Sequence, residues 1–128
     1  MRLAVLADIP GIVDMIEDLR AAVSGPLPVD RSWASQTLVR LMSSEDGYVA
    51  VTDGGFIAGV MQPTVINPAP VAKELGWFAR DRSGLHLLRG FEAWAASRGA
   101  ALVQLSTGPE RLDLSRLGYR CVELAWVK

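Results

Sequence analysis

A strand pattern, a helix pattern and a second strand pattern follow one another between residues 71 and 105, and this order restricts the fold strongly. Residues 71–79 (VAKELGWFA) and 101–105 (ALVQL) are typical of short strands. Between them, apolar side chains recur at helical spacing and form one stripe, which consists of Leu87, Leu88, Phe91, Trp94 and Ala95. Strands joined through a helix usually pair in parallel, so this unit predicts a sheet that carries a helix on one face.

An antiparallel meander is predicted just before this unit. Residues 48–52 (YVAVT) are rich in β-forming residues, and Asp53-Gly54-Gly55 is a strong hairpin turn signal. The returning strand is expected over residues 56–65, with a bulge or an edge position at Pro63. A meander followed by a strand–helix–strand unit predicts a mixed, mostly antiparallel sheet flanked by helices.

The two ends of the chain add further elements. Residues 2–6 suggest a first strand; Asp8 and Asp30 are candidate N-caps of two helices. The second of these helices is expected to bury Trp33, Thr37, Leu38 and Leu41. A short helix over residues 110–117, stopped by Gly118, and a closing strand over residues 120–127 complete the chain. The predicted class is α/β (α+β), in the order β-α-α-β-β-β-α-β-α-β.

Composition restricts what the chain can be. Its 128 residues fit a single domain spanning residues 1–128. The net charge of −1 gives no reason to expect nucleic acid as a partner. One cysteine and one histidine exclude a disulfide and a thiolate zinc site, and no metal is expected. No apolar run approaches the length of a membrane span, so we expect a cytoplasmic protein.

Residues 80–94 (RDRSGLHLLRGFEAW) gather positive charge and a glycine where a helix begins. One interpretation is a solvated turn in which Ser83 acts as an ordinary N-cap. The other is a phosphate cradle, because a helix N-terminus presents free N–H groups and partial positive charge to an anion.

Several phrases of the sequence, and their order, resemble the GNAT (Gcn5-related N-acetyltransferase) superfamily over nearly the whole chain. RLAVLADIPGIVDMIEDL is similar to its opening strand and first helix, and YVAVTDGGFIAGVM to its second and third strands. The stretch from KELGWFA to ALVQL is similar to its fourth strand, acyl-CoA loop, third helix and fifth strand. LSRLGYRCVE is similar to its late helix, which ends in a Gly-aromatic pair.

The resemblance implies a GNAT (acyl-CoA N-acyltransferase) fold in which strands 71–79 and 101–105 splay apart around the pantetheine arm of acetyl-CoA, the acyl donor substrate. It places the pyrophosphate on the loop that opens the third helix, with Arg80, Arg82, Ser83, Gly84 and Leu85 as the binding residues. The backbone N–H groups of Phe78 and Ala79 are implied to polarise the thioester carbonyl.

The loop departs from the family pattern of Gln or Arg, two residues, Gly, one residue, then Gly or Ala. If Gly84 is the last glycine, Arg82 stands at the first glycine position and Ala79 at the leading position. If Arg80 leads instead, the loop is one residue short. A side chain at the first glycine position would crowd the pyrophosphate.

Acyl transfer to an amine requires a base, and Glu74 is the only carboxylate in residues 71–79. The family often places a catalytic glutamate on this strand, and burial there would raise its pKa. Strand alternation alone leaves open whether Glu74 faces the splay or solvent. Leu114 stands where the family usually has its proton-donating tyrosine, so either water protonates the thiolate or the protein is a weak or lapsed catalyst.

The sequence therefore predicts an acetyl-CoA-dependent N-acetyltransferase acting on an amine of a small molecule, a peptide or a protein. The alternative is a non-catalytic GNAT-fold module that binds a partner or senses acyl-CoA; modification of a nucleobase is disfavoured by the near-neutral charge. The predicted strand 120–127 would leave an apolar edge, which suggests a homodimer.

Overall fold

Five strands form one mixed sheet in the computed structural model of the chain, which describes residues 1–110 and 112–128. The strands are β1 (Arg2–Leu3), β2 (Gly47–Thr52), β3 (Gly55–Gln62), β4 (Val71–Ala79) and β5 (Leu102–Gln104), and they lie side by side in chain order. All neighbours pair antiparallel except β4 and β5, which are parallel. The predicted mixed sheet is confirmed.

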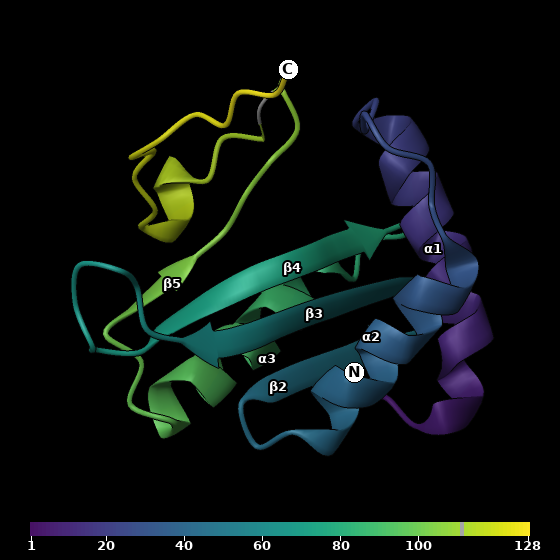
Figure 1. Cartoon of the computed structure of the whole chain (residues 1–128), viewed down its shortest axis with the longest axis horizontal. Coiled ribbons are helices and arrows are strands. Elements are labelled where there is room, and N and C mark those ends of the chain that lie inside the picture. Colours follow the sequence, from purple (N-terminus) through teal and green to yellow (C-terminus); the bar gives the residue numbers. More distant parts are fainter. Residues whose placement is uncertain (111) are drawn as a thin grey trace.

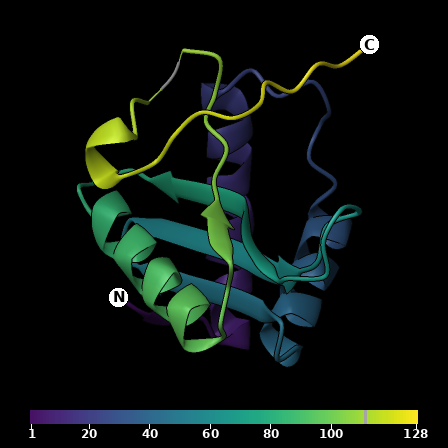
Figure 2. The ribbon, with the colours of Figure 1, turned by 90° about the vertical axis from the view of Figure 1, so that its left-hand side faces the viewer.

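Three helices cover the two faces of the sheet, as Figures 1 and 2 show. Helices α1 (Ile9–Ala22) and α2 (Arg31–Ser43) lie on one face, and α3 (Gly84–Ser97) lies on the other. Two short 3-10 turns, η1 (Leu6–Asp8) and η2 (Ser115–Leu117), complete the described elements. The predicted strand–helix–strand unit is present as β4–α3–β5, because a parallel pair needs a crossover connection and a helix supplies it.

Each face of the sheet has its own apolar core. On the α1–α2 face, Phe56, Ile12 and Val13 are almost fully buried. On the α3 face, the stripe expected from helical spacing buries Leu87, Leu88, Phe91 and Ala95, while Trp94 packs partly buried beside them. Gly99 has φ +73° just after α3, which is the left-handed conformation predicted for its C-terminal cap.

The N-terminal segment differs from expectation near Asp8. Strand β1 ends at Leu3, and η1 follows before α1 begins. Asp8 occupies the N-cap position of α1 without capping its N–H groups. Its carboxylate instead accepts a hydrogen bond from the Val5 N–H at 2.8 Å and pairs with Arg2 at 2.7 Å, so it closes the turn ahead of the helix.

The buried face of α2 agrees with the prediction at Leu38 and Leu41, which pack against the core, but not at Trp33. Asp30 caps the helix as expected, since its Oδ1 accepts a hydrogen bond from the Trp33 N–H at 3.0 Å. Leu38 is buried, but Trp33 is 61% exposed, with the Arg40 guanidinium 5.1 Å from its ring centroid. The prediction that Trp33 lies in the core was wrong, because Leu38 packs together with Ala34 rather than with Trp33.

Strand β3 ends at Gln62 rather than residue 65, because Pro63 has no N–H to continue the ladder. One irregularity interrupts the β3–β4 register: Ala58 pairs with Gly76 and Gly59 pairs with Glu74, so Leu75 is an extra residue on β4. This is the geometry of a β-bulge, and it changes the direction of β4 at Glu74.

The predicted closing strand is wrong. Residues 118–128 form no helix or strand, and Val122, Leu124 and Trp126 are exposed. The predicted helix over residues 110–117 is reduced to η2 in the described part of the chain, and Arg111 lies outside the described residues. A strand needs a paired edge, and β5, with only three residues, presents little edge for the tail to pair with.

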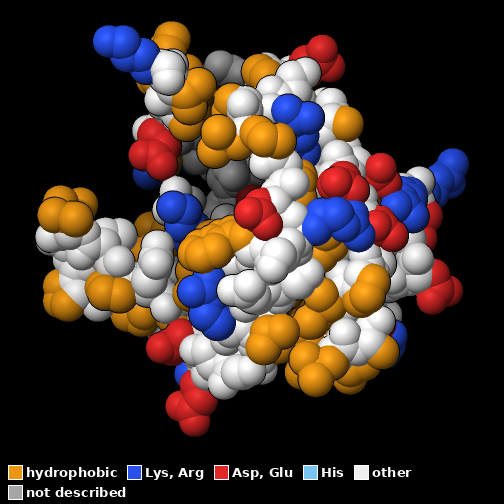
Figure 3. All heavy atoms as spheres, turned by 45° about the vertical axis from the view of Figure 1, so that its right-hand side comes forward, with side chains coloured by type: hydrophobic (Ala, Val, Ile, Leu, Met, Phe, Trp, Pro, Cys, Tyr) orange, Lys and Arg blue, Asp and Glu red, His pale blue; other side chains and the backbone are white. Residues whose placement is uncertain are grey.

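The described surface mixes charges of both signs. On the face drawn in Figure 3, Lys and Arg side chains alternate with Asp and Glu, and hydrophobic side chains lie between them. Among the described helices, none combines the length and the apolar composition that crossing a membrane would require.

Candidate functional site

Strands β4 and β5 separate just before Glu74. Their parallel register runs from Val71 and Leu102 to Lys73 and Gln104 and stops there. Strand β4 continues to Ala79 without β5 beside it, while the chain after β5 runs away from the sheet (Figures 1 and 2). This divergence is the splay that the family resemblance implies, and it leaves one edge of β4 open.

Glu74 is the buried charged side chain at this divergence, with 7% of its surface exposed. Its Oε2 accepts hydrogen bonds from the Ser106 backbone N–H at 3.1 Å and from the Ser106 Oγ at 3.3 Å. The solvent-facing alternative for Glu74 is therefore excluded. Burial raises the pKa of Glu74, and the two Ser106 hydrogen bonds and the nearby Lys73 offset part of that rise.

A glycine makes room opposite Glu74. Gly59 is its partner in the β3–β4 register, and the Phe91 ring of α3 lies directly over Gly59. A Cβ on Gly59 would lie 2.6 Å from Phe91 Cζ and 2.9 Å from the Lys73 carbonyl oxygen. Only glycine fits between α3 and the sheet at this level.

The backbone of β4 presents one of the two predicted N–H groups to the open edge. The Arg80 N–H donates to the Gly54 carbonyl at 2.7 Å, on the β3 side. N–H groups alternate in direction along a strand, so the Phe78 N–H, two residues before Arg80, also points toward β3. Phe78 is paired there with Phe56. Ala79 faces the opposite way, toward the open edge, and of this predicted pair it alone is free to contact a ligand there.

The loop from β4 to α3 holds the remaining predicted residues. Gly84 begins α3, and the Trp77 indole N–H donates to its carbonyl at 3.0 Å. Ser83 stands at the N-cap position but does not cap, because its Oγ is 2.7 Å from Thr52 Oγ1. Arg82 and Leu85 are exposed. No described side chain caps the first turn of α3, so its N–H groups remain available to an anion.

Two carboxylates compete for the donors of this loop. Asp81 Oδ1 accepts the Ser83 N–H at 2.9 Å, and the Ser83 hydroxyl together with this N–H holds the pKa of Asp81 below its usual range. Arg80 donates from Nε at 3.0 Å and from Nη2 at 2.6 Å to Oδ2 of Asp18 on α1. The loop therefore carries the positive charge that the sequence predicts, but in this structure part of that charge is already paired.

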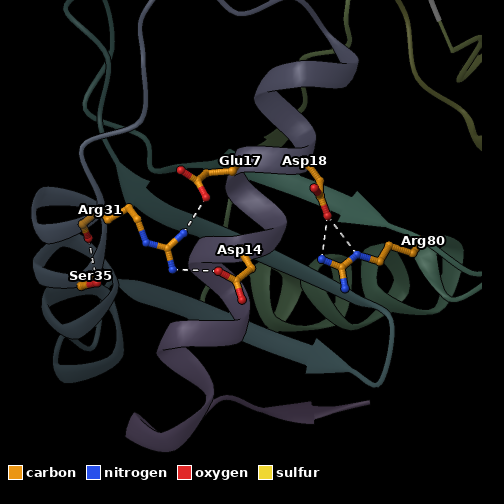
Figure 4. A network of polar contacts seen from close by, with 6 residues as sticks. All are labelled: Asp14, Glu17, Asp18, Arg31, Ser35 and Arg80. Atoms are coloured by element: carbon orange, nitrogen blue, oxygen red, sulfur yellow. Dashed lines mark hydrogen bonds and ion pairs between the residues drawn. The ribbon is translucent and has the colours of Figure 1, made fainter.

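Figure 4 shows that the pair belongs to a wider set of contacts on α1. Arg31 of α2 bridges two carboxylates of that helix, with Nη1 2.6 Å from Glu17 Oε2 and Nη2 2.7 Å from Asp14 Oδ1. Helix α1 is thus tied through its exposed carboxylates both to α2 and, through Asp18, to the loop before α3.

Leu114 and Tyr119 lie in the segment after β5. Leu114 precedes η2 and offers no exchangeable proton from its side chain. Tyr119, the aromatic residue of the Gly-aromatic pair, packs partly buried against the core on the α3 face. Burial and the nearby Glu92 carboxylate raise the pKa of Tyr119 to about 12, so its hydroxyl stays protonated at neutral pH.

Two surface pockets lie away from Glu74. One of about 680 Å³ is lined by residues that include Asp8, Val51, Asp53 and Asp81, near the start of α1. The other, of about 310 Å³, lies between the end of α1 and residues 108–110 and 112. None of the predicted site residues lines either pocket. The candidate site is therefore the open edge of β4 together with the start of α3.

Ser106 and Asp18 are the site neighbours that sequence reasoning missed. Ser106 directly follows the short apolar run 101–105, but its contact with Glu74 depends on the β4–β5 register. Asp18 is 62 residues from Arg80 in sequence and is one of several carboxylates along α1. Neither residue has a local sequence signal of its role.

Similarity to known proteins is found at the level of structure. No family model matches the chain, and no curated protein matches it in sequence. A transcriptional regulator from Bacillus halodurans C-125 superposes with a TM-score of 0.76 at 21% identity, covering 99% of this chain and 96% of that one.

Two acetyltransferase structures are also similar. A candidate acetyltransferase from Arthrobacter sp. FB24 has a TM-score of 0.70 at 26% identity, covering 91% of this chain and 80% of that one. A GNAT family acetyltransferase from Staphylococcus aureus has a TM-score of 0.67 at 15% identity, covering 99% and 95%. These similarities and the splayed β4–β5 pair confirm the resemblance seen in the sequence: the chain has the fold of the GNAT superfamily.

Proposed function

We propose that this protein is an N-acyltransferase that transfers the acetyl group of acetyl-CoA directly to an amine. The observation that carries the proposal is the position of Glu74, a buried carboxylate where β4 loses its β5 partner. The open edge leads from Glu74 toward the uncapped first turn of α3, so a base and an anion-binding helix end lie at two ends of one strand segment.

Acetyl-CoA supplies the activated acyl group, and the residues of this chain supply binding and proton transfer. The N–H groups that open α3, together with Arg80 and Arg82, would hold the diphosphate. At Gly84 an added Cβ would meet only ordinary contacts, the nearest with Ala79 Cβ at 3.6 Å, so the packing of the protein itself leaves space there and does not require glycine. The Ala79 N–H would donate to the thioester oxygen as negative charge develops on it.

Glu74 would take the proton of the attacking amine. A carboxylate with a raised pKa is a stronger base than a solvated one, and burial raises the pKa of Glu74. The new bond joins the amine nitrogen to the acyl carbon, and the carbon–sulfur bond breaks. Water protonates the departing thiolate, since the side chain of Leu114 has no proton to give; a thiolate is only moderately basic, so it can leave without a stronger acid.

The acceptor is proposed only as a class: an amine of a small molecule, a peptide or a protein. The cytoplasm is the proposed location, as expected from a sequence without an apolar run of membrane-spanning length.

Calorimetry with acetyl-CoA tests the binding part of the proposal. We expect binding to the wild type and weaker binding to an Arg80→Ala/Arg82→Ala double variant, because two cations are removed from the diphosphate loop. An Arg116→Ala/Arg120→Ala double variant, with two exposed arginines of the segment after β5 removed, is the matched control. No heat at millimolar acetyl-CoA would reject the proposal and leave the non-catalytic alternative.

Thiol release with a panel of amines tests the catalytic part. Glu74→Gln keeps the size of the side chain and removes the base, so we expect a loss of about 100-fold or more in kcat. Glu45→Gln, at an exposed position before β2, controls for loss of a carboxylate. Unchanged thiol release in Glu74→Gln would eliminate Glu74 as the base.

A further inference from the structure

A single serine joins β4 to the chain beyond β5 at the point where the two strands separate. The Ser106 N–H and Oγ both donate to Glu74, at 3.1 and 3.3 Å. The last paired residues are Lys73 and Gln104, so this contact crosses the opening just beyond the end of the ladder, from the first residue after Lys73 to the second residue after Gln104. It replaces the backbone hydrogen bonds that a continued β4–β5 pair would have formed.

Both hydrogen bonds reach the same carboxylate oxygen. Ser106 donates twice to Oε2, and in the described part of the chain no hydrogen bond reaches Oε1. A carboxylate held at one oxygen is fixed in orientation while its other oxygen keeps its lone pairs. Oε1 is therefore the atom available to accept a proton.

The other surroundings of Glu74 do little to orient it. Gly59 faces it from β3 and has no side chain, and the α3 residue over Gly59 is the apolar Phe91. Lys73, its neighbour on β4, is the charged group that favours the ionised form. Ser106 supplies the hydrogen bonds from the segment after β5, so the orientation of the carboxylate depends mainly on this one residue.

We propose that Ser106 is the positioning residue of Glu74: it holds Oε2 across the opening between β4 and β5 and leaves Oε1 to take the proton of the acceptor amine. The role of Glu74 as base rests on the proposed function, whereas the hold of Ser106 on Glu74 does not. Because the two hydrogen bonds stabilise the carboxylate, they also keep Glu74 ionised to lower pH than burial alone would allow.

Titration of the Glu74 side-chain carboxyl, followed by carbon-13 NMR in the full chain, tests the inference without any need for activity. Ser106→Ala removes the hydroxyl donor and keeps the backbone N–H. The charged form then loses one of its hydrogen bonds, so we expect the Glu74 midpoint to move to higher pH. Ser106→Gly removes the same donor and provides a second variant should the alanine variant fail to fold.

Two further variants serve as controls. Ser106→Thr keeps a hydroxyl on the same carbon and should restore a midpoint close to the wild type. Ser43→Ala removes an exposed serine hydroxyl of α2, which donates to the Val39 carbonyl and does not contact Glu74. An unchanged Glu74 midpoint in folded Ser106→Ala or Ser106→Gly would overturn the inference.

The pH dependence of thiol release separates this inference from the proposed function. In Ser106→Ala the acidic limb of the kcat profile should move to higher pH along with the Glu74 midpoint, while the KM for acetyl-CoA stays unchanged. If the Glu74 midpoint shifts in Ser106→Ala but the acidic limb of the kcat profile does not, the positioning role of Ser106 in catalysis is overturned. Absence of thiol release from the wild type with every amine would overturn the proposed function, and the titration would still decide whether Ser106 holds Glu74.

Discussion

Replacing Asp18 by asparagine should strengthen the binding of CoA. Arg80 makes two hydrogen bonds to one oxygen of Asp18, at 3.0 and 2.6 Å, and these must be weakened or given up when the guanidinium turns to a diphosphate. The Asp18 charge also repels an anion bound to the loop. Asp18→Asn removes the charge, keeps the size of the side chain and leaves Arg80 free to pair with the ligand.

The size of the effect follows from the exposure of the pair. The Arg80 and Asp18 side chains are 53% and 49% exposed, so solvent screens their attraction strongly. Exposed ion pairs contribute about 0.2–1 kcal/mol, which corresponds to at most about a fivefold decrease in the Kd for CoA. The gain should shrink as salt is raised from about 0.01 M to about 1 M, because the Debye length falls from about 30 Å to about 3 Å.

Calorimetry with CoA at low and high salt measures this effect. Asp14→Asn is the matched control, since Asp14 lies on the same helix and pairs with Arg31 instead of Arg80. If Asp18→Asn binds CoA no more tightly than the wild type, while Arg80→Ala binds it more weakly, then Asp18 does not compete for Arg80 and the reasoning is refuted.

Three other outcomes are expected. Gly59→Ala should lower the free energy of unfolding by about 1–3 kcal/mol in urea denaturation, because its Cβ would clash with Phe91; Gly11→Ala in α1, where a Cβ has open space, should not be destabilising. The Arg2 pair and the Val5 N–H lower the pKa of Asp8 to about 2, so they stabilise the fold above the unfolded value of about 3.8. The stability difference between the wild type and Asp8→Asn should therefore disappear as pH falls from 4 toward 2; a constant difference would contradict this. Light scattering tests whether the exposed apolar tail forms the expected homodimer; a dimer should weaken in Trp126→Ser, and a monomer at high concentration would remove the hypothesis.

The sequence was a good guide wherever the determining signal is local. Strand 71–79 has the predicted bounds, Asp30 caps α2, and Gly99 takes the left-handed conformation after α3. The buried stripe of α3 follows directly from the helical period. These features depend on neighbours a few residues apart, so residue order alone is sufficient to predict them.

The same local signals failed where a tertiary partner was required. Residues 120–127 alternate like a strand, but no sheet edge pairs with them in the structure. Trp33 has the large apolar side chain typical of a core residue, yet the packing of α2 on the sheet leaves this side chain exposed to solvent. Periodicity describes a segment's preference, whereas burial and pairing depend on what the rest of the chain places against it.

At the candidate site, the sequence identifies the functional residue types, whereas the contacts between these residues depend on the fold. Glu74 and the charged start of α3 are visible in the residue order, and so is the resemblance to the GNAT superfamily. The early end of the β4–β5 ladder, the Ser106 hold on Glu74 and the Asp18 pair with Arg80 are not. Each of these depends on strand register and helix placement, which are set by packing the whole sheet between its helices and therefore by contacts between residues far apart in the chain.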